Sequence, residues 1–516
     1  MLQRTGPVDC FTINVIHEPA VVPMTPRKRE ICLTFGLPPR ESPRALVENV
    51  ELQVGPGRIV LLCGASGSGK SSILRRLAEQ VESPIWVGRS ALKSTLPLID
   101  AIAPRQRLSV AMEILTACGM GEPRLWIRRY TDLSDGEKFR AALARAIGTA
   151  LRAPSPGTIL CDEFTALLHR RAAKAIAHNL RKLVSRHHLS LVVATAQDDI
   201  IEDLQPDEIV RLGGHESSVV AASPSDRPIS LRRDAFIEPG SLRDYRRFGE
   251  MHYRTRDGLG FVDKVFLLRE SSENEPLGIL IFAHAPRELA LRNLVTQGRF
   301  IRNMRRLNRE LRILRRLVMH PDIRGCGLGH WFVRSTLPMV GVRFVECLAV
   351  MGAVNPIFEK AGMTRIGRCP LPRGRLALLN RMRQMKLDPF TPDFDRKVAL
   401  YPRIRELVER TIRDWVTSTQ SAAPYDVAHR TPLELAAVFR QIIGEPPMYY
   451  LWDRDGEFPL RDTVNRSNDH PPTRSPSRRS PHRTPRIDTP KEKDRHRPDG
   501  NVCRGKMRRS RYRKQC

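Results

Sequence analysis

A glycine-rich loop between an apolar run and an amphipathic run constrains this chain more than any other feature. The run RIVLLC at residues 58–63 is typical of a buried strand, and SSILRRLAEQV at residues 71–81 has the periodicity of a helix. Between them the sequence matches G-x-x-x-x-G-K-S, the pattern of a loop that folds around phosphate groups. The residues assigned to nucleotide binding in this loop are Gly64, Ala65, Ser66, Gly67, Ser68, Gly69, Lys70, Ser71 and Ser72.

The chemistry of this loop points to ATP with Mg²⁺. Glycines allow successive backbone N–H groups to turn toward the phosphates, and the helix N-terminus adds partial positive charge. Lys70 is expected to reach the β and γ phosphates. The hydroxyl of Ser71 is the expected Mg²⁺ ligand, because Mg²⁺ takes few protein oxygens together with phosphates and waters.

A second apolar run, residues 158–161, ends in two carboxylates. Asp162 is suited to bind Mg²⁺, and Glu163 is suited to polarise the attacking water as the catalytic residue. Paired acids at a strand end can also cap a helix. The phosphate loop upstream favours the catalytic interpretation.

The sequence LSDGEK at residues 133–138 resembles the LSGGQ signature of the ABC ATPase family. The resemblance implies that Ser134 and Gly136 of one protomer close over the γ-phosphate held by another, in a head-to-tail homodimer around ATP. The switch histidine of the family is replaced by Ala196, followed by Gln197, which implies slow or differently regulated hydrolysis.

The order of apolar runs predicts an α/β fold for the N-terminal part. Buried-type runs alternate with helical stretches from residue 58 to 212, the signature of a parallel sheet. Upstream, FTINVI, EICLTFGL and ALVENVELQV are expected to be antiparallel strands. The predicted organisation is an ABC-type P-loop domain at 1–222, a mixed α/β domain at 231–388, a mainly helical region at 389–460 and a disordered basic tail at 461–516.

A second glycine loop, R-x-x-G-x-G, lies in the mixed α/β domain between an expected strand and the helix HWFVRSTLP. Such a loop is an anion cradle, although the pattern alone is weak. With the downstream run NPIFEKAGM at residues 355–363, it resembles the GNAT acyltransferase family. The resemblance implies that the loop holds the pyrophosphate of acetyl-CoA or another acyl-CoA, through Arg324, Gly325, Cys326, Gly327, Leu328 and Gly329. It also implies that the preceding strand, with Val318 and Met319, pairs with the pantetheine, and that the stretch beginning at Asn355 borders the thioester.

The chemistry of acyl transfer is less defined than this fold. Phe358 stands where the family often has a tyrosine that acts as a general acid. Glu346 and His252 are candidates for deprotonating an amine acceptor, and either one can equally be a structural partner. The order of the two domains resembles a family of ABC ATPases fused to a predicted acetyltransferase, whose second part is similar to phage Mom-like DNA-modifying proteins. That resemblance implies a nucleobase amine as the acceptor.

A net charge of +30 favours polyanionic partners, with nucleic acid as the main candidate. The cationic segment 292–311, which includes Phe300, suits phosphate contact and base stacking, or else is a solvated loop whose apolar residues lie in the core. The run at 508–514 is a further basic surface. No apolar stretch is long enough to span a bilayer, so we expect a soluble cytoplasmic protein without a membrane contact.

These features together predict an ATPase that is also an acetyl-CoA-dependent N-acetyltransferase acting on an amine of a nucleic acid. The alternative is a nucleic-acid-binding ABC ATPase switch with a non-catalytic GNAT fold. A third interpretation, the motor subunit of a membrane transporter, gives no reason for the second domain or for the basic tail.

Overall fold

The structure is a computed structural model that describes residues 8–456, apart from gaps at 41, 89–91, 93–94, 154–156, 214–215, 222–226, 250, 252–258, 272–274, 371–372 and 420–426. The chain divides into Met1–Arg466 and Ser467–Cys516, and every described residue belongs to the first of these units. His252 and the predicted tail therefore lie outside the described residues. In the described part, no helix is long and apolar enough to cross a membrane.

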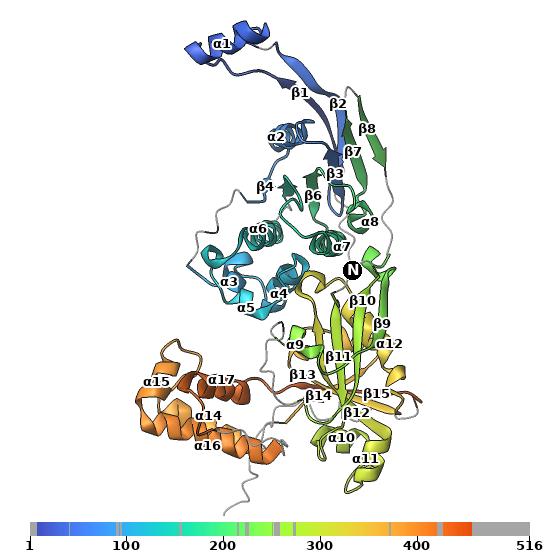
Figure 1. Cartoon of the computed structure of the whole chain (residues 1–516), viewed down its shortest axis with the longest axis vertical. Coiled ribbons are helices and arrows are strands. Elements are labelled where there is room, and N and C mark those ends of the chain that lie inside the picture. Colours follow the sequence, from blue (N-terminus) through green and yellow to red (C-terminus); the bar gives the residue numbers. More distant parts are fainter. Residues whose placement is uncertain are drawn as a thin grey trace, which may run out of the picture. The chain divides into compact units, whose positions relative to one another are not determined.

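The first domain is built on a six-stranded sheet with the order β4-β5-β6-β3-β7-β8 (Figure 1). All neighbouring strands are parallel except β7 and β8, as the alternation of apolar and helical runs predicted. The carboxyl ends of the parallel strands meet at one edge, so the loops after β3, β5 and β6 lie together. The strands are β3 (Ile59–Gly64), β4 (Pro84–Trp86), β5 (Thr158–Cys161), β6 (Ser190–Thr195), β7 (Glu208–Gly213) and β8 (Glu216–Ala221).

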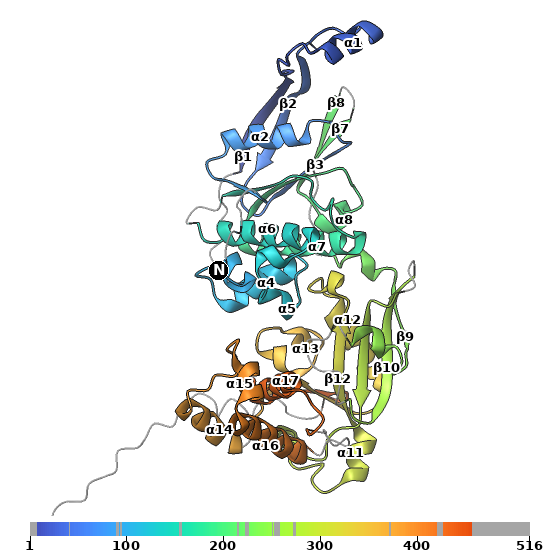
Figure 2. The ribbon, with the colours of Figure 1, turned by 60° about the vertical axis from the view of Figure 1, so that its left-hand side comes forward.

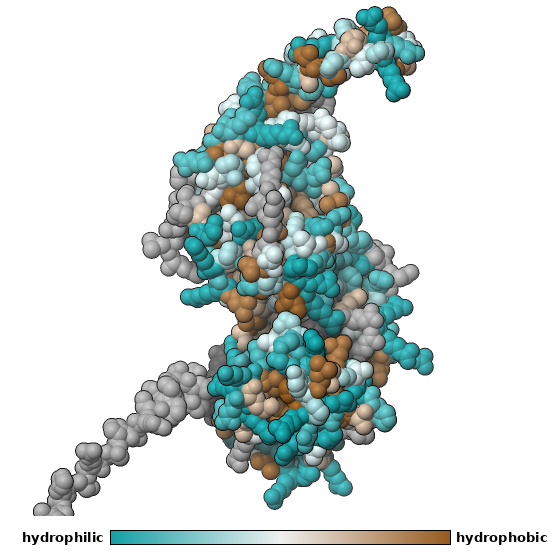
Figure 3. Space-filling model, turned by 90° about the vertical axis from the view of Figure 1, so that its left-hand side faces the viewer, coloured by the Kyte–Doolittle hydropathy of each residue, from teal (hydrophilic) through white to brown (hydrophobic). Residues whose placement is uncertain are grey.

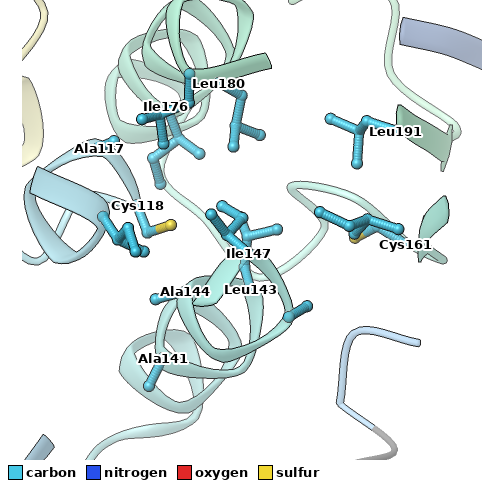
Figure 4. Close-up of a cluster of buried hydrophobic side chains, with 14 of the residues drawn as sticks. Ala117, Cys118, Ala141, Leu143, Ala144, Ile147, Cys161, Ile176, Leu180 and Leu191 are labelled. Atoms are coloured by element: carbon cyan, nitrogen blue, oxygen red, sulfur yellow. The ribbon is translucent and has the colours of Figure 1, made fainter. Parts of the chain in front are cut away.

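Both faces of this sheet are covered, because alternate side chains of each strand point to opposite sides. Leu61 of β3 packs with α3, α4, α6 and α7, in the core where Figure 4 shows Ile147, Ile176 and Leu191. Leu62 packs on the other face with α2 and the N-terminal strands. The helices are α2 (Lys70–Gln80), α3 (Leu98–Ile102), α4 (Leu108–Ala117), α5 (Pro123–Trp126), α6 (Asp135–Ala150), α7 (Arg170–His187) and α8 (Ile201–Leu204).

The N-terminal residues form an arm in which β1 (Asp9–His17) pairs antiparallel with β2 (Arg44–Val54). The run EICLTFGL, expected to be a strand, instead belongs to helix α1 (Pro26–Phe35). Thr25 caps the helix N-terminus with its side chain, proline occupies the first turn, and Gly36 ends the helix at a φ of 62°. These end signals outweigh the alternation of apolar residues. No residue of α1 is buried, and Figure 3 shows hydrophobic side chains on the surface of the arm.

The second domain contains a seven-stranded sheet with the order β9-β10-β11-β12-β13-β15-β14. Only β12 and β13 are parallel neighbours, and their ladder joins residues 311–314 to residues 344–347. The ladder stops there, although β12 continues to Met319. The strands are β9 (Ala235–Pro239), β10 (Val262–Glu270), β11 (Gly278–Ala283), β12 (Leu311–Met319), β13 (Phe344–Ala349), β14 (Thr364–Arg368) and β15 (Met448–Asp453).

Helices cover both faces of the second sheet (Figure 2). Side chains of α12 and α13 pack on one face. The opposite face receives α9, α10 and α11. The helices are α9 (Tyr245–Phe248), α10 (Ala290–Val295), α11 (Met304–Glu310), α12 (Leu328–Thr336) and α13 (Ile357–Lys360), with 3-10 turns at Ser230–Arg232, Pro321–Ile323, Pro338–Val340 and Val350–Ala353. A further 3-10 turn, Tyr130–Asp132, belongs to the first domain.

The region predicted as mainly helical, 389–460, also supplies a strand. Helices α14 to α17 share a core of their own and lie in the chain between β14 and β15. β15 then pairs with both β13 and β14, so the last strand of the second sheet lies beyond the boundary expected at residue 388. The helices are α14 (Arg373–Gln384), α15 (Phe394–Leu400), α16 (Pro402–Thr419) and α17 (Pro432–Ile443).

Candidate functional site

The phosphate loop joins β3 directly to α2, as the sequence predicted. The Nζ of Lys70 donates hydrogen bonds to the carbonyl oxygens of Gly64, at 2.7 Å, and Ala65, at 2.6 Å. Gly64 is tightly enclosed, since a Cβ there would lie 2.3 Å from the carbonyl oxygen of Leu212. Gly69 has a φ of 96° and begins α2. The loop is therefore a narrow backbone cradle with an ammonium group inside it, at a helix N-terminus, which fits a polyphosphate.

The two acids follow β5 at the same edge of the sheet. β6 lies between β5 and β3, so the acids and the phosphate loop are about 10 Å apart, two strand spacings. Asp162 accepts a hydrogen bond from the N–H of Glu163 at 3.0 Å. Glu163 is exposed and has a φ of 50°, a strained conformation of a kind that is common at functional sites. The N–H of Phe164 donates to Ala194 of β6 at 2.8 Å and holds this loop in place.

The switch position carries a polar cluster that the sequence did not reveal. Ala196 and Gln197 follow β6 and are exposed. Arg170, the first residue of α7, donates from Nε to Asp199 at 2.9 Å and from its guanidinium to Gln197. Arg170 is a basic residue at the start of the helix that follows the acidic pair, and this pattern could have predicted the contact.

The signature residues begin helix α6. Ser134 is exposed and caps the helix, because its hydroxyl accepts from the N–H of Glu137 while the Glu137 carboxylate accepts from the N–H of Ser134 at 2.9 Å. A Cβ at Gly136 would lie 3.3 Å from the carbonyl oxygen of Leu167. Ser134 and Gly136 thus occupy a helix N-terminus, a place that favours anions.

The second glycine loop follows β12 and leads into α12, but its arginine does not face a free phosphate site. The guanidinium of Arg324 donates to three carbonyl oxygens, those of Met319 at 3.1 Å, Gly121 at 3.3 Å and Met251 at 2.9 Å. Gly121 belongs to the first domain, and a Cβ there would lie 3.0 Å from the stem of Arg324. The donors of Arg324 are engaged in this arrangement, so its contact with a pyrophosphate stays a prediction that requires this packing to open.

The other residues assigned to acyl-CoA fall into two groups. Those with buried side chains are Val318, Met319, Cys326 and Leu328. The thiol of Cys326 donates to the carbonyl oxygen of Ile323, and burial raises the pKa of this thiol to about 11. Gly325, Gly327 and Gly329 shape the turn, and Gly325 and Gly327 have φ values of 86° and 98°. Asn355 is exposed.

A tyrosine from β15 lies beside Phe358. The ring centroids of Phe358 and Tyr450 are 5.3 Å apart. The Tyr450 hydroxyl lies 3.1 Å from both the carbonyl oxygen of Gly352 and a carboxylate oxygen of Glu359. Burial and the neighbouring Glu359 raise the pKa of Tyr450 above its usual value, so the hydroxyl keeps its proton at neutral pH. Tyr450 is about 90 residues from Phe358 in the chain, so no local sequence pattern predicts their contact.

Glu346 lies inside a closed ion pair. A carboxylate oxygen of Glu346 is 3.1 Å from the guanidinium of Arg292, and neither side chain is exposed. The other carboxylate oxygen accepts a hydrogen bond from the Tyr449 hydroxyl at 3.0 Å. Burial raises the pKa of the Glu346 carboxyl to about 7, although Arg292 opposes the shift. A base for an acceptor amine must reach that amine, so this geometry favours the structural role that the sequence left open.

The cationic segment 292–311 is not the continuous binding surface that its composition indicated. Arg292 is the buried partner of Glu346. Phe300 is buried against Phe344 and has no face for a base to stack on. Arg299 and two other arginines of the segment share Glu310 as an ion-pair partner. The interpretation in which apolar residues of this segment lie in the core therefore holds for Phe300, whereas neither interpretation predicted the burial of Arg292.

Comparisons with known proteins concern the first domain. A family model described as an AAA domain matches residues 52–201. The phosphonates import ATP-binding protein PhnC of Paraburkholderia xenovorans is 28% identical over 231 residues, which cover 35% of this chain and 73% of that protein. The hemin import ATP-binding protein HmuV of Gloeobacter violaceus is 29% identical over 205 residues, which cover 32% of this chain and 72% of that protein.

Among solved structures, the dimeric post-hydrolysis state of the ATP-binding cassette MJ0796 bound to ADP and Pi matches 34% of this chain and 92% of its own, at 21% identity and a TM-score of 0.27. The residues that the family model matches include the phosphate loop, the signature and the acidic pair. The N-terminal domain is an α/β P-loop ATPase domain of the ABC type, with ATP as its ligand.

Proposed function

We propose that this protein is an ATP-hydrolysing, acyl-CoA-dependent N-acyltransferase that acts on an amine of a nucleic acid. The observation that carries the proposal is the second sheet, in which the ladder between the parallel strands β12 and β13 stops at residue 314 while β12 continues to a glycine loop and α12. The GNAT resemblance implies that acyl-CoA lies along this strand and reaches that loop. The order of the seven strands supports the same assignment.

The first domain supplies the ATP site. Lys70 would bind the β and γ phosphates, and Ser71 and Asp162 would hold Mg²⁺, which neutralises phosphate charge when bound. Glu163 would orient the attacking water. Ser134 and Gly136 would complete the site of a second copy of the chain, and the exposed N-terminus of α6 supports this homodimer.

Acyl transfer needs a proton for the departing sulfur. The amine attacks the thioester carbonyl, a C–N bond forms, the C–S bond breaks, and the sulfur leaves as a thiolate. Phe358 has no proton to give. The ring of Tyr450 lies beside that of Phe358, but Tyr450 is buried and its hydroxyl is bound to Gly352 and Glu359, so the thiolate would take its proton from solvent.

The test uses the full-length protein with radiolabelled acetyl-CoA, cellular DNA, RNA and protein, with and without ATP. Label in nucleic acid is the expected result, and failure to bind acetyl-CoA in either condition would refute the acyltransferase.

A second candidate is a nucleic-acid-binding ATPase switch whose second domain is not catalytic. The engaged donors of Arg324 and the closed pair of Glu346 favour it. Binding of acetyl-CoA without transfer to any of the three pools would support this candidate over the first.

A further inference from the structure

Helix α7 of the first domain contacts the second domain along one face. Arg171, Ala175, Asn179 and Lys182 follow one another at helical spacing and share that face. The Nε of Arg171 lies 3.1 Å from a carboxylate oxygen of Glu270, and the two side chains are only 6% and 9% exposed. Ala175 is buried in the core that contains α12. A buried ion pair beside an apolar contact is a fixed interface.

Farther along α7, the interface covers the second glycine loop. Asn179 donates to the carbonyl oxygen of Arg324 at 3.5 Å. A Cβ at Gly325 would lie 3.2 Å from Asn179 and 3.0 Å from Thr116 at the end of α4. The guanidinium of Arg324 donates to Gly121, just beyond α4. A phosphate group can bind these loop donors only if this packing opens.

The other end of α7 is attached to the nucleotide edge. The helix starts shortly after Glu163, and Arg170 binds Asp199 in the loop that follows β6. Arg170 and Arg171 are consecutive, so one contacts the ATP edge of the sheet and the next contacts the second domain. A packed helix moves as a rigid unit, so a shift of its first turn is carried along its length.

We propose that α7 couples the ATP site to the glycine loop: binding of Mg²⁺-ATP moves α7 and uncovers residues 324–329 for the pyrophosphate of the acyl donor. The identity of that ligand rests on the proposed function. The coupling itself rests on the contacts of Arg170, Arg171 and Asn179.

The test measures amide hydrogen exchange in full-length Glu163→Gln protein, which is expected to retain ATP. With Mg²⁺ and ATP, the amides of residues 325–331 should exchange about tenfold faster than without nucleotide. Filter binding establishes that ATP is bound. Unchanged exchange in the ATP-bound protein would overturn the coupling.

Two variants that weaken the contacts between α7 and the second domain give a second test of the coupling. Glu270→Gln and Asn179→Ala each loosen the interface, so the loop should exchange at the fast rate with and without ATP, while ATP binding persists. The control is Glu238→Gln, which breaks a neighbouring ion pair with Arg269 inside the second domain and should keep the ATP response. If the amides of residues 325–331 exchange slowly without ATP and faster with ATP in both variants, α7 does not couple the two sites.

Acetyl-CoA binding separates this inference from the proposed function. In equilibrium dialysis, the Glu270→Gln variant should bind acetyl-CoA without ATP, whereas the unsubstituted protein should bind acetyl-CoA only when ATP is present. A loop that opens with ATP in a protein that never binds acetyl-CoA would support the coupling and refute the acyl-CoA assignment.

Discussion

Replacing Arg292 by methionine tests whether the buried pair with Glu346 stabilises the second sheet. The side chain of Arg292 donates to Glu346 and to the carbonyl oxygens of Pro286 and Arg287, at 2.8 and 2.6 Å. Methionine fills much of the same volume but donates nothing. Since removing one partner of a buried pair costs about 3–5 kcal/mol, we expect a loss near 3 kcal/mol, because Tyr449 still binds Glu346.

The loss should depend on pH. The pKa of Glu346 is about 7 when folded and near 4.5 when unfolded, so its burial removes stability as pH rises from about 4.5 to 7. Without Arg292 the folded pKa rises further, and stability continues to fall above pH 7. The difference between Arg292→Met and the parent should therefore be small near pH 5 and large near pH 9. Arg292→Met combined with Glu346→Gln should regain most of the loss and remove this pH dependence.

The assay is hydrogen exchange of the β13 amides in the full-length protein, because a chain with several domains need not unfold in one step. Arg309→Met is the control, since the Arg309 side chain is 77% exposed and its pair with Glu310 is worth less than about 1 kcal/mol. An equal loss at pH 5 and pH 9 would refute the reasoning. The reasoning would also be refuted if the double variant Arg292→Met with Glu346→Gln were no more stable than Arg292→Met alone.

Two predictions concern the phosphate loop. Lys70→Ala should weaken ATP binding by at least about tenfold in a filter assay, because a charge-assisted contact is lost, whereas Lys397→Ala in α15 should have no effect. Gly64→Ala should weaken ATP binding similarly, since the new Cβ meets the Leu212 carbonyl at 2.3 Å, and Gly213→Ala, with nothing within 4 Å, should not. Normal ATP binding by Lys70→Ala or Gly64→Ala would show that this loop does not bind the phosphates of ATP.

The sequence predicted the phosphate loop, the acidic pair and the parallel sheet that carries them because their signals are local. The strand, the glycine loop and the helix around Lys70 are contiguous, and the acids directly follow the apolar run of β5. Contacts distant in sequence escaped prediction. β15 pairs with β13 across about 100 residues, so its apolar run was included in a helical region. Arg324 lies in the predicted strand, turn and helix order, but its partner Gly121 is about 200 residues away.

Several arginines are used inside the protein, although those paired with carboxylates form neutral pairs and leave the net charge of +30 unchanged. Arg171 and Arg292 are paired with buried carboxylates, Arg181 binds Asp207 with only 8% of its side chain exposed, and Arg324 binds carbonyl oxygens. A planar guanidinium with five donors is suited to such internal bonds. Arginines that are bonded inside the protein cannot contact a phosphate backbone, so nucleic-acid binding has to be argued from the exposed arginines. The interface along α7 uses two of these internal arginines, Arg171 and Arg324, to join the domains, so their role is to hold the domains together and not to bind a polyanion.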